Sequence, residues 1–286
     1  MNKTFKLTVS SFLILLFFYK FMLPATSIDK QDPKFKINQL LSKKIISVEK
    51  FSEYLYKNFI TLDDKYLQKV LIIIPYRQRE PQLIVTLKKL DEILKGIDYN
   101  IIISEQNDNG YFNKASLMNA GFLAALKYNI SAGCLIFHDS DMIINSNEGS
   151  PYKCSIYPKH ISRATDKFMY KLPYYELVGG VFAIPTSTFL RVNGYSNLYE
   201  GWGSEDDDIF KRINNLGIPV VRANESVKFK MLKHTQADIT GNNYKLLEKS
   251  LFRYRLDGLN SINYSAEIVA NSNFHAVNLL HFKINF

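Results

Sequence analysis

The sequence predicts an α/β domain built on a mostly parallel mixed sheet that is flanked by helices. Continuous apolar runs rich in β-branched residues alternate with segments of helical spacing, which is typical of strands buried on both faces and joined by crossover helices. The chain has 286 residues, of which 47% are hydrophobic. This length and composition are sufficient for one large core, so we expect one folded domain with an N-terminal appendage.

The predicted strands and helices follow one another in a regular order. Residues 70–74 and 101–103 are apolar strand segments, and residues 81–94 between them have helical spacing. Residues 113–127 are helical again, and residues 134–137 form a third apolar run. Ligands of such sheets bind at the carboxyl ends of the parallel strands, so the polar residues that follow these strands are the first candidates for a site.

The N-terminal segment has the features of a signal anchor. Lys3 and Lys6 precede an apolar run over residues 7–23, which ends at Pro24 and is near the lower length limit for a bilayer span. Because the positive charges lie on its N-terminal side, we expect a type II topology with a lumenal remainder. A cleaved signal peptide is the alternative, but no clear cleavage site follows the apolar run.

We therefore expect three parts. Residues 1–26 form a cytoplasmic tail and signal anchor, residues 27–67 a Lys-rich stem, and residues 68–286 the catalytic domain. Within the stem, a short amphipathic helix is predicted around residues 48–59. The formal charge of +9 suggests nucleic acid or acidic lipid as a partner. The Lys and Arg residues are scattered without a basic stripe, however, so we expect no nucleic-acid partner and a preference for phosphate-bearing ligands.

Two cysteines agree with a secretory compartment. Cys134 and Cys154 flank an acidic loop, which a disulfide between them would close in an oxidising lumen. Two unrelated buried thiols are the alternative. Glycosylation sequons at Asn129, Asn224 and Asn263 also suit a secretory protein.

Residues 201–208 are the most informative stretch, because four consecutive acids follow a Gly-Trp-Gly-Ser turn. Ser204 is a favourable helix N-cap, and the helix macrodipole favours acids in the first turn of a helix that continues through Ile213. An acidic first turn on a surface helix is the plainer interpretation. It accounts for one or two acids, but not for four beside the only Trp of the chain, an aromatic plate suited to a sugar face.

Polar clusters also follow the first and third predicted strands. Arg77 and Arg79 are placed to clamp a nucleotide or its phosphates. In an extended segment Asp139 and Asp141 point the same way, so one can face a ribose while the other holds a divalent cation. An Asx-type turn that closes the strand is the alternative, and an acid-x-acid pair alone is a weak motif.

Met231 and His234 add a thioether and an imidazole three positions apart. Each residue type is more often structural than ligating. Together with Asp141 they form a plausible one-carboxylate, one-imidazole, one-thioether site, and this mixed ligand set suits manganese.

In combination, these segments resemble the β-1,4-galactosyltransferase family of inverting glycosyltransferases over about residues 70–265. Their order and near-constant spacing make the joint match specific, although no single segment is. The segments are IIIPYRQRE (72–80), FNKASLMNAGF (112–122), CLIFHDSDMI (134–143), PKHISRATDKF (158–168), LPYYELVGGVFAIP (172–185), FLRVNGYSNLYEGWGSEDDDIFKRI (189–213), MLKH (231–234) and DGLNSINY (257–264).

The resemblance implies a fold of the GT-A type and a set of functional residues. Asp206 would be the general base, and Asp141, Met231 and His234 would hold Mn²⁺ as the cofactor. The residues implied to bind the nucleotide-sugar donor are Pro75, Arg77, Arg79, Phe112, Lys114, Asp139, Lys167, Leu177 and Gly180.

The resemblance also implies a binding site for the acceptor sugar. Glu205 would bind the acceptor sugar, and Trp202 with Tyr174 would shape its pocket. A disulfide between Cys134 and Cys154 has a counterpart in the family. The segment after His234 corresponds to a loop that closes over bound donor.

The activity implied is transfer of galactose or N-acetylgalactosamine from the UDP-sugar to the 4-hydroxyl of a GlcNAc-terminated glycoprotein or glycolipid, with inversion. The location implied is the Golgi membrane, with the catalytic domain lumenal. A base removes the acceptor proton and a counter-charge stabilises the leaving diphosphate. Because Asp206 is expected at a helix N-terminus, we expect its carboxylate to stay ionised.

Three positions depart from the family pattern. Ser204 stands where Gly is usual, and Lys114 replaces a frequent Arg. Leu177 stands where vertebrate galactosyltransferases carry a Tyr that crowds the C2 substituent of the sugar. An aliphatic residue there resembles invertebrate members that accept UDP-GalNAc, so we hypothesise that UDP-GalNAc is used at least as well as UDP-Gal.

Two other functions remain open. A lectin-like or regulatory protein would keep the sugar-nucleotide pocket without turnover, but the presence of Asp206, Asp141 and His234 argues against it. A metal-dependent phosphoesterase or nuclease would account for the acidic clusters and the positive charge. It would leave Trp202 and the lumenal signals without a role.

Overall fold

The computed structural model describes residues 47–59, 68–145, 150–235, 242–270, 274, 276 and 278–286. The predicted anchor and most of the predicted stem lie outside these residues. Gly241, in the predicted loop after His234, also lies outside them. Among the described residues, no helix is both long and apolar enough to cross a bilayer.

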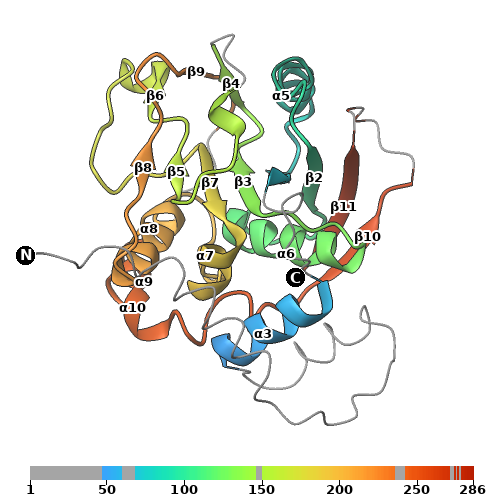
Figure 1. The fold of residues 1–286 in the computed structure, drawn as a ribbon, viewed down its shortest axis with the longest axis vertical. Helices are drawn as coiled ribbons and strands as arrows, with labels where there is room; N and C mark the ends of the chain where they lie inside the picture. The colour runs from blue at the N-terminus through green and yellow to red at the C-terminus, as the bar shows by residue number, and fades with distance from the viewer. Residues whose placement is uncertain are drawn as a thin grey trace, which may run out of the picture.

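The described chain contains helices, strands and two short 3₁₀ turns (Figure 1). The helices are α3 (Val48–Phe59), α5 (Glu80–Ile93), α6 (Lys114–Lys127), α7 (Thr186–Arg191), α8 (Glu205–Asn215), α9 (Asn243–Glu248) and α10 (Ser250–Arg253). The strands are β1 (Val70–Tyr76), β2 (Tyr99–Gln106), β3 (Cys134–His138), β4 (Met142–Ile144), β5 (Lys159–His160), β6 (Ala164–Thr165), β7 (Val181–Pro185), β8 (Val221–Arg222), β9 (Lys228–Met231), β10 (Ser265–Ile268) and β11 (Leu279–Asn285). The 3₁₀ turns are η1 (Ser150–Tyr152) and η2 (Asp166–Phe168).

A mixed eight-stranded sheet forms the centre, with the order β10-β11-β2-β1-β3-β7-β5-β8. Its middle strands β11, β2, β1 and β3 run parallel to one another. Strand β7 is antiparallel to both β3 and β5, and β10 is antiparallel to β11. The predicted mixed sheet is therefore confirmed, with its parallel strands in the middle.

The continuous apolar runs arise because both faces of the central strands are buried. Leu71 and Ile73 of β1 pack in one core with α6, whereas Val70, Ile72 and Ile74 pack in a second core with α5. The two helices lie above and below the middle strands in Figure 1. This burial explains why a period-two pattern is absent from β1.

Helix α6 confirms the predicted helix over residues 113–127. The side chain of Asn113 caps it by accepting a hydrogen bond from the backbone N–H of Ser116 (2.8 Å). At Gly121 an added Cβ would lie only 2.9 Å from Ile73 Cγ2, so glycine allows the helix to approach β1 closely. The close packing fixes the start of α6 at the carboxyl edge of the parallel strands.

Helix α3 confirms the amphipathic helix predicted within the stem. Its Phe51 and Leu55 are buried in the core that contains α6, and Ser52 Oγ donates to Leu190 O (3.4 Å). The packed structure therefore includes α3, before the domain boundary that we expect at residue 68.

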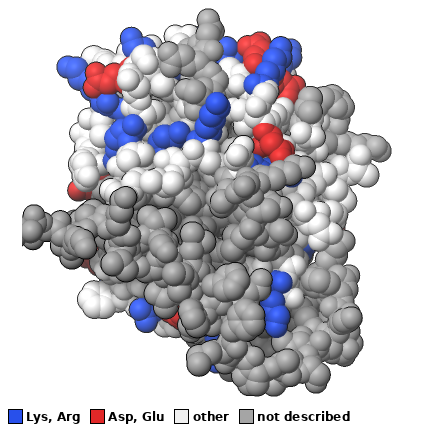
Figure 2. Space-filling view, viewed as in Figure 1, with Lys and Arg blue, Asp and Glu red and all other residues white. Residues whose placement is uncertain are grey.

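A second sheet of three strands, in the order β4-β9-β6, lies beside the large one. Its antiparallel register pairs Met142 of β4 with Met231 of β9. This pairing brings the segment before His234 next to Asp141. On the molecular surface, Figure 2 shows a short row of Lys and Arg side chains across the upper half of one face, with acidic side chains at its margins. The positive charge is thus partly gathered on that face.

Candidate active site

The acidic pair Asp139 and Asp141 lies between β3 and β4. The backbone N–H of Met142 donates to Asp139 O (3.3 Å), so the segment turns directly after the strand. The expectation that the two carboxylates point the same way is wrong, because the turn separates them. Asp139 faces Lys114, whereas Asp141 faces His234. The pair therefore contributes one carboxylate to each of two neighbouring clusters.

The first cluster contains the three residues expected to hold a metal. His234 Nε2 lies 2.6 Å from Asp141 Oδ2, and His234 Nδ1 lies 2.8 Å from Thr235 O. A proton on Nδ1 that is donated to this carbonyl leaves Nε2 available as a ligand, which is the usual arrangement of metal-binding histidines. Met231 pairs with Met142, and Leu232 N donates to Asp141 O (2.8 Å), so the chain from Met231 to His234 runs beside Asp141.

These residues fit a divalent cation. Among the described residues, no three His, Cys, Asp or Glu side chains gather as a metal site, and the predicted ligand set accordingly contains one carboxylate, Asp141, one imidazole, His234, and the Met231 thioether. The Asp141 side chain is 3% exposed, and burial, together with neighbouring Asp139, raises its pKa. A bound cation would offset this burial and restore the ionised carboxylate. The mixed oxygen, nitrogen and sulfur set suits a borderline metal such as manganese.

The two arginines after β1 have different surroundings. Arg77 Nη1 donates to Gly110 O (2.7 Å), and its guanidinium carbon lies 5.4 Å from the centroid of the Phe112 ring. Arg79 faces the metal cluster instead, with Nη1 3.9 Å from Asp141 Oδ2. The structure thus brings Arg77 together with Phe112, and Arg79 together with the metal ligands.

Two further donor candidates lie at the same edge. Pro75 is in the last, buried part of β1, two residues before Arg77. Lys167 is in η2, and the preceding Asp166 accepts a hydrogen bond from the backbone N–H of Met231 (2.9 Å). Lys167 therefore lies close to β9, the strand that carries Met231.

The second cluster is centred on the ammonium of Lys114. Lys114 Nζ lies 3.2 Å from Asp139 Oδ1, 3.1 Å from Glu205 Oε1 and 3.2 Å from Asp206 Oδ2, and its side chain is 16% exposed. Burial disfavours the charged form, but the three carboxylates outweigh it and hold the pKa of Lys114 well above its usual range. Lys114 therefore stays charged, in contact with the carboxylates of Asp139 and Asp206.

Asp206 differs in its electrostatics from what its helix position suggests. Burial raises the pKa of Asp206 well above the ordinary aspartate value, and Glu205 and Asp139 add to this effect, whereas Lys114 opposes it. The helix N-terminus is therefore not the only influence on the charge of Asp206, because loss of hydration disfavours the ionised carboxylate and the Lys114 ammonium favours it. A carboxylate with a raised pKa is a stronger general base.

The four acids of α8 fall into different environments. Glu205 and Asp206 face Lys114, and Asp207 hydrogen-bonds with the Tyr174 hydroxyl. Asp208 is fully buried and turned away from the site. Its partners are Tyr199 Oη (2.8 Å), Arg212 Nε (2.5 Å) and Arg253 Nη2 (2.7 Å). The interpretation of all four acids as functional residues is thus wrong for Asp208, which joins α8 to α10 through Arg253.

Ser204 does not cap α8 with its side chain. It has φ +74°, in the left-handed region, and makes no side-chain hydrogen bond to the first turn. Ser204 thus lies at the predicted N-cap position, but the prediction that its side chain caps the helix is wrong. The preceding turn also has positive φ at Gly201 (71°) and Gly203 (104°), and this backbone explains why glycine suits position 204.

The acceptor candidates Trp202 and Tyr174 are half-exposed, at 50% and 45%. The Trp202 turn is held from two sides. Gly201 N donates to Phe112 O (2.9 Å), and the Asn243 side chain donates to Glu200 O and Gly203 O (3.0 Å each). Sequence reasoning missed this role of Asn243, because the backbone carbonyls that it contacts in the Trp202 turn are about 40 residues away.

The loop that carries Leu177 ends against both clusters. Asp139 N donates to Gly180 O (2.8 Å), and Leu177 itself is partly buried. A Cβ added at Gly179 would lie 2.5 Å from Asp206 Oδ2. Position 179 therefore accepts only glycine while Asp206 keeps its place.

Cys134 and Cys154 are adjacent thiols in the structure. Cys134 is buried at the start of β3, and a hydrogen bond to its thiol lowers the pKa of Cys154. The disulfide between them stays a prediction. The three sequon asparagines, Asn129, Asn224 and Asn263, are all exposed.

Comparisons with known proteins agree with this arrangement. Residues 32–155 match the N-terminal region of glycosyl transferase group 7, and residues 159–235 match a model described as the N-terminal domain of galactosyltransferase. Mouse β-1,4-galactosyltransferase 5 is 40% identical over 206 residues, which are 70% of this chain and 52% of the relative. Mouse β-1,4-galactosyltransferase 1 is 37% identical over 232 residues, 79% of this chain and 56% of the relative. The chain thus spans about half the length of these curated relatives.

A solved structure shares the fold. The catalytic domain of Drosophila β-1,4-galactosyltransferase 7 with xylobiose superposes with a TM-score of 0.62 at 25% identity, and covers 76% of this chain and 94% of that chain. A mutant of that enzyme has been crystallised with manganese, UDP-Gal and xylobiose, with a TM-score of 0.61. The fold is therefore of the glycosyltransferase GT-A type. The chain belongs to the β-1,4-galactosyltransferase family.

Proposed function

We propose that this protein transfers galactose or N-acetylgalactosamine from the UDP-sugar to the 4-hydroxyl of a GlcNAc-type acceptor, with inversion. The observation that carries the proposal is the meeting of two clusters at one strand edge. Asp141 and His234 meet at 2.6 Å, and Asp139 shares the Lys114 ammonium with Glu205 and Asp206. One acid-x-acid turn thus supplies Asp141 to the proposed metal site and Asp139 to the cluster that contains the proposed base, Asp206.

In this proposal Asp206 accepts the proton of the acceptor hydroxyl. The hydroxyl oxygen forms the new bond to the anomeric carbon while the bond from that carbon to the diphosphate oxygen breaks, and UDP leaves with the bonding electron pair. Displacement from the opposite face converts an α-linked donor to a β-linked product. The raised pKa of Asp206 favours proton uptake, and Glu205 beside it would accept a hydrogen bond from the acceptor sugar.

Asp141, Met231 and His234 would hold Mn²⁺, the ion named with the Drosophila relative. When bound, the ion supplies positive charge for the leaving diphosphate. Arg79 lies at this cluster, and Arg77 with Phe112 forms the adjacent edge where the nucleotide would bind. Tyr174 and Trp202 expose aromatic faces suited to an acceptor sugar.

The choice of donor sugar is proposed from Leu177. Its partly buried aliphatic side chain lies in the loop that ends against Asp206. A smaller side chain than tyrosine leaves room for the acetamido group of UDP-GalNAc. We therefore expect Leu177→Tyr to reduce GalNAc transfer more than galactose transfer.

The location is also a proposal, because it depends on residues 1–26. We propose a type II protein of the Golgi membrane with residues 68–286 in the lumen. In intact microsomes that contain the full chain, trypsin should leave this lumenal part uncut until the membrane is opened with detergent. Digestion without detergent would contradict the topology.

The decisive experiment is a donor and acceptor panel with the purified full chain. UDP-Gal and UDP-GalNAc are offered with Mn²⁺ or with EDTA, against GlcNAc, xylose and glucose acceptors, and the linkage of the product is determined. We expect a Mn²⁺-dependent β-1,4 product with GlcNAc. Asp206→Asn should lower kcat by about 10²- to 10⁴-fold and leave the binding of UDP with Mn²⁺ unchanged.

The outcome separates this function from the two alternatives. Binding of UDP-sugar without transfer would indicate a lectin-like or regulatory protein. Hydrolysis of a phosphodiester without sugar transfer would indicate a phosphoesterase. Transfer by Asp206→Asn at a rate close to that of the native protein would show that another group is the base.

A further inference from the structure

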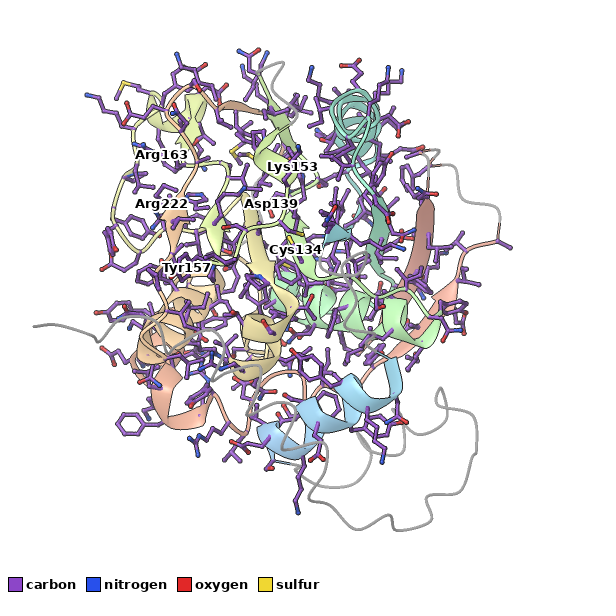
Figure 3. All side chains as sticks on the ribbon, in the orientation of Figure 1. Cys134, Asp139, Lys153, Tyr157, Arg163 and Arg222 are labelled. Carbon is purple, nitrogen blue, oxygen red and sulfur yellow. The ribbon has the colours of Figure 1, made fainter. Side chains whose placement is uncertain are left out.

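The loop over residues 174–180 is held mainly by side chains that come from other parts of the chain. It contains no helix or strand. Arg222 Nη1 donates to Leu177 O (2.6 Å), and Arg222 Nη2 donates to Tyr175 O. One guanidinium group thus binds two carbonyls of the loop, one of them at the proposed donor-selecting residue. Figure 3 shows Arg222 on the β8 ribbon, with Arg163 close by and Asp139 nearer the centre of the molecule.

His160 continues this contact toward the reacting groups. Arg222 Nη1 lies 2.8 Å from His160 Nδ1, and because arginine only donates, Nδ1 must be the acceptor. The proton is therefore on Nε2, which donates to Gly179 O (2.9 Å). Burial and the charge of Arg222 lower the pKa of His160 to about 3, so the ring is neutral at physiological pH. Its tautomer and orientation are fixed by these two bonds.

The far end of the loop leaves no free space for movement toward the site. Ser162 Oγ also donates to Gly179 O (3.0 Å), and it accepts a hydrogen bond from Val181 N (2.7 Å). Gly179 is packed against the Asp206 carboxylate, where an added Cβ would be 2.5 Å from Oδ2. A displaced carbonyl at residue 177 or 179 would therefore shift Leu177 and Asp206 together.

The pairing of two very short strands creates this arrangement. β5 and β8 contain two residues each, and they run parallel with His160 opposite Arg222. β5 is also paired with β7, where His160 lies opposite Phe182. The edge of the large sheet thus fixes His160 and Arg222, and the side chains of these two residues hold the loop.

We propose that Arg222 and His160 are positioning residues that set both donor-sugar selectivity and the placement of the base. They act through the carbonyls of residues 175, 177 and 179, without touching the substrate. The proposal rests on the proposed transfer reaction. It adds a determinant of selectivity that is separate from the side chain at position 177.

The test uses Arg222→Lys in the full chain, with Arg163→Lys as the matched control. A lysine keeps the charge but has no planar fork for two carbonyls and an imidazole. Arg163 is the neighbouring guanidinium, and it forms an ion pair with the exposed Glu225 rather than with the loop. Steady-state kcat and KM are measured for UDP-Gal and UDP-GalNAc, together with the melting temperature and the affinity for UDP with Mn²⁺.

For Arg222→Lys we expect kcat to fall by about tenfold, and the ratio of kcat/KM for the two donors to change by at least about threefold, because small misplacements at a reacting centre cost one to two orders of magnitude. The affinity for UDP with Mn²⁺ should stay unchanged, and Arg163→Lys should behave like the native protein. His160→Gln, which keeps one of the two hydrogen bonds, should show the same change of ratio with a smaller loss of kcat.

A purely structural role predicts a different result. A lower melting temperature or a smaller active fraction would reduce kcat for both donors equally and leave their ratio and both KM values unchanged. That result, or native kinetics for both variants, would overturn the proposal. If the native protein transfers neither sugar, the proposed function itself fails, and the two failures are thereby distinguished.

Discussion

Lys114 lies where acidic side chains from two separate elements meet. Asp139 follows β3, whereas Glu205 and Asp206 begin α8, and all three carboxylates are within 3.2 Å of the same ammonium. Without a cation these carboxylates would repel one another in a site with little water. Lys114 therefore allows the carboxylates of Asp139, Glu205 and Asp206 to lie side by side.

Lys114→Met tests this role through stability and its pH dependence. Removal of the ammonium leaves three poorly hydrated carboxylates unpaired, so we expect a loss of about 3 kcal/mol in the free energy of unfolding at pH 8. The pKa of Asp206 is already raised in the folded state, and it should rise further. A raised folded pKa favours the folded state as the pH falls, so the loss should be smaller at pH 5.

Urea unfolding at the two pH values measures the effect. Lys114→Arg keeps the charge and should remain within about 1 kcal/mol of the native protein. An equal loss for Lys114→Met at pH 5 and pH 8 would show that the ammonium does not balance the carboxylates.

The sequence predicts the place of a site residue better than its partners. Lys114 and Asp139 both follow strands of a parallel sheet, and this rule alone puts them at one edge. The resemblance implies only donor binding for Lys114, however, and its contact with α8 depends on tertiary packing. Nothing in the local pattern marks Arg222 or His160, because their contact arises from two-residue strands that are 62 positions apart.

At the scale of elements, the long buried segments were predictable and the short ones were not. Apolar runs indicate β1, β2 and β3, and helical spacing indicates α5 and α6, all of which are confirmed. Strand β11 pairs in parallel with β2, from Leu279 opposite Ile101 onward. Such pairing between distant segments is set by the whole sheet, so no local signal identified this strand.

Helix α8 combines a functional end with a structural anchor, and Asp208→Asn tests the anchor. Asp208 is 0% exposed and shared by Arg212 and Arg253. Removal of its charge leaves two guanidinium groups with less compensation, so we expect a loss of about 3 to 5 kcal/mol in the free energy of unfolding. Asp207→Asn is the neighbouring control and should cost less than about 1 kcal/mol. Similar urea midpoints for the two variants would contradict the assignment of Asp208 to the core.

Ser204 offers a second test at the start of α8. Because its φ is +74° and its side chain makes no capping bond, Ser204→Gly should stabilise the protein by about 0.5 to 1 kcal/mol. Ser204→Ala should be close to neutral, since no hydrogen bond is lost. The opposite order, with alanine costing about 1 kcal/mol and glycine little, is what an N-cap predicts. Thermal unfolding of the two variants decides between these interpretations.

At the scale of the whole molecule, the site is assembled from distant parts of one sheet system. The carboxyl ends of β1 and β3, the end of β9, and the starts of α6 and α8 all meet there. The chain between Cys134 and Cys154 contains β3, β4 and both acid-x-acid carboxylates. A covalent link between these two positions would therefore restrain the segment that carries the metal carboxylate.

The predicted Cys134–Cys154 disulfide depends on the compartment in which the protein folds, because such a bond forms in an oxidising lumen. The two thiols are already in contact, and the lowered pKa of Cys154 favours the thiolate that begins oxidation. As the S–S bond forms, oxidised glutathione would take up the two electrons and the two thiol protons, and it would leave as two molecules of reduced glutathione. Closure of a loop of this length should stabilise the folded state by about 3 kcal/mol in the chain-entropy account.

Thiol titration of the denatured protein, before and after reduction, gives the measurement, together with urea unfolding with and without dithiothreitol. We expect no free thiol before reduction in protein made in an oxidising compartment, and a midpoint that falls on reduction. Cys154→Ser should unfold like the reduced native protein under both conditions. Two free thiols in protein made in an oxidising compartment, or a midpoint that reduction does not change, would rule out the link and leave Cys134 and Cys154 as a thiol pair.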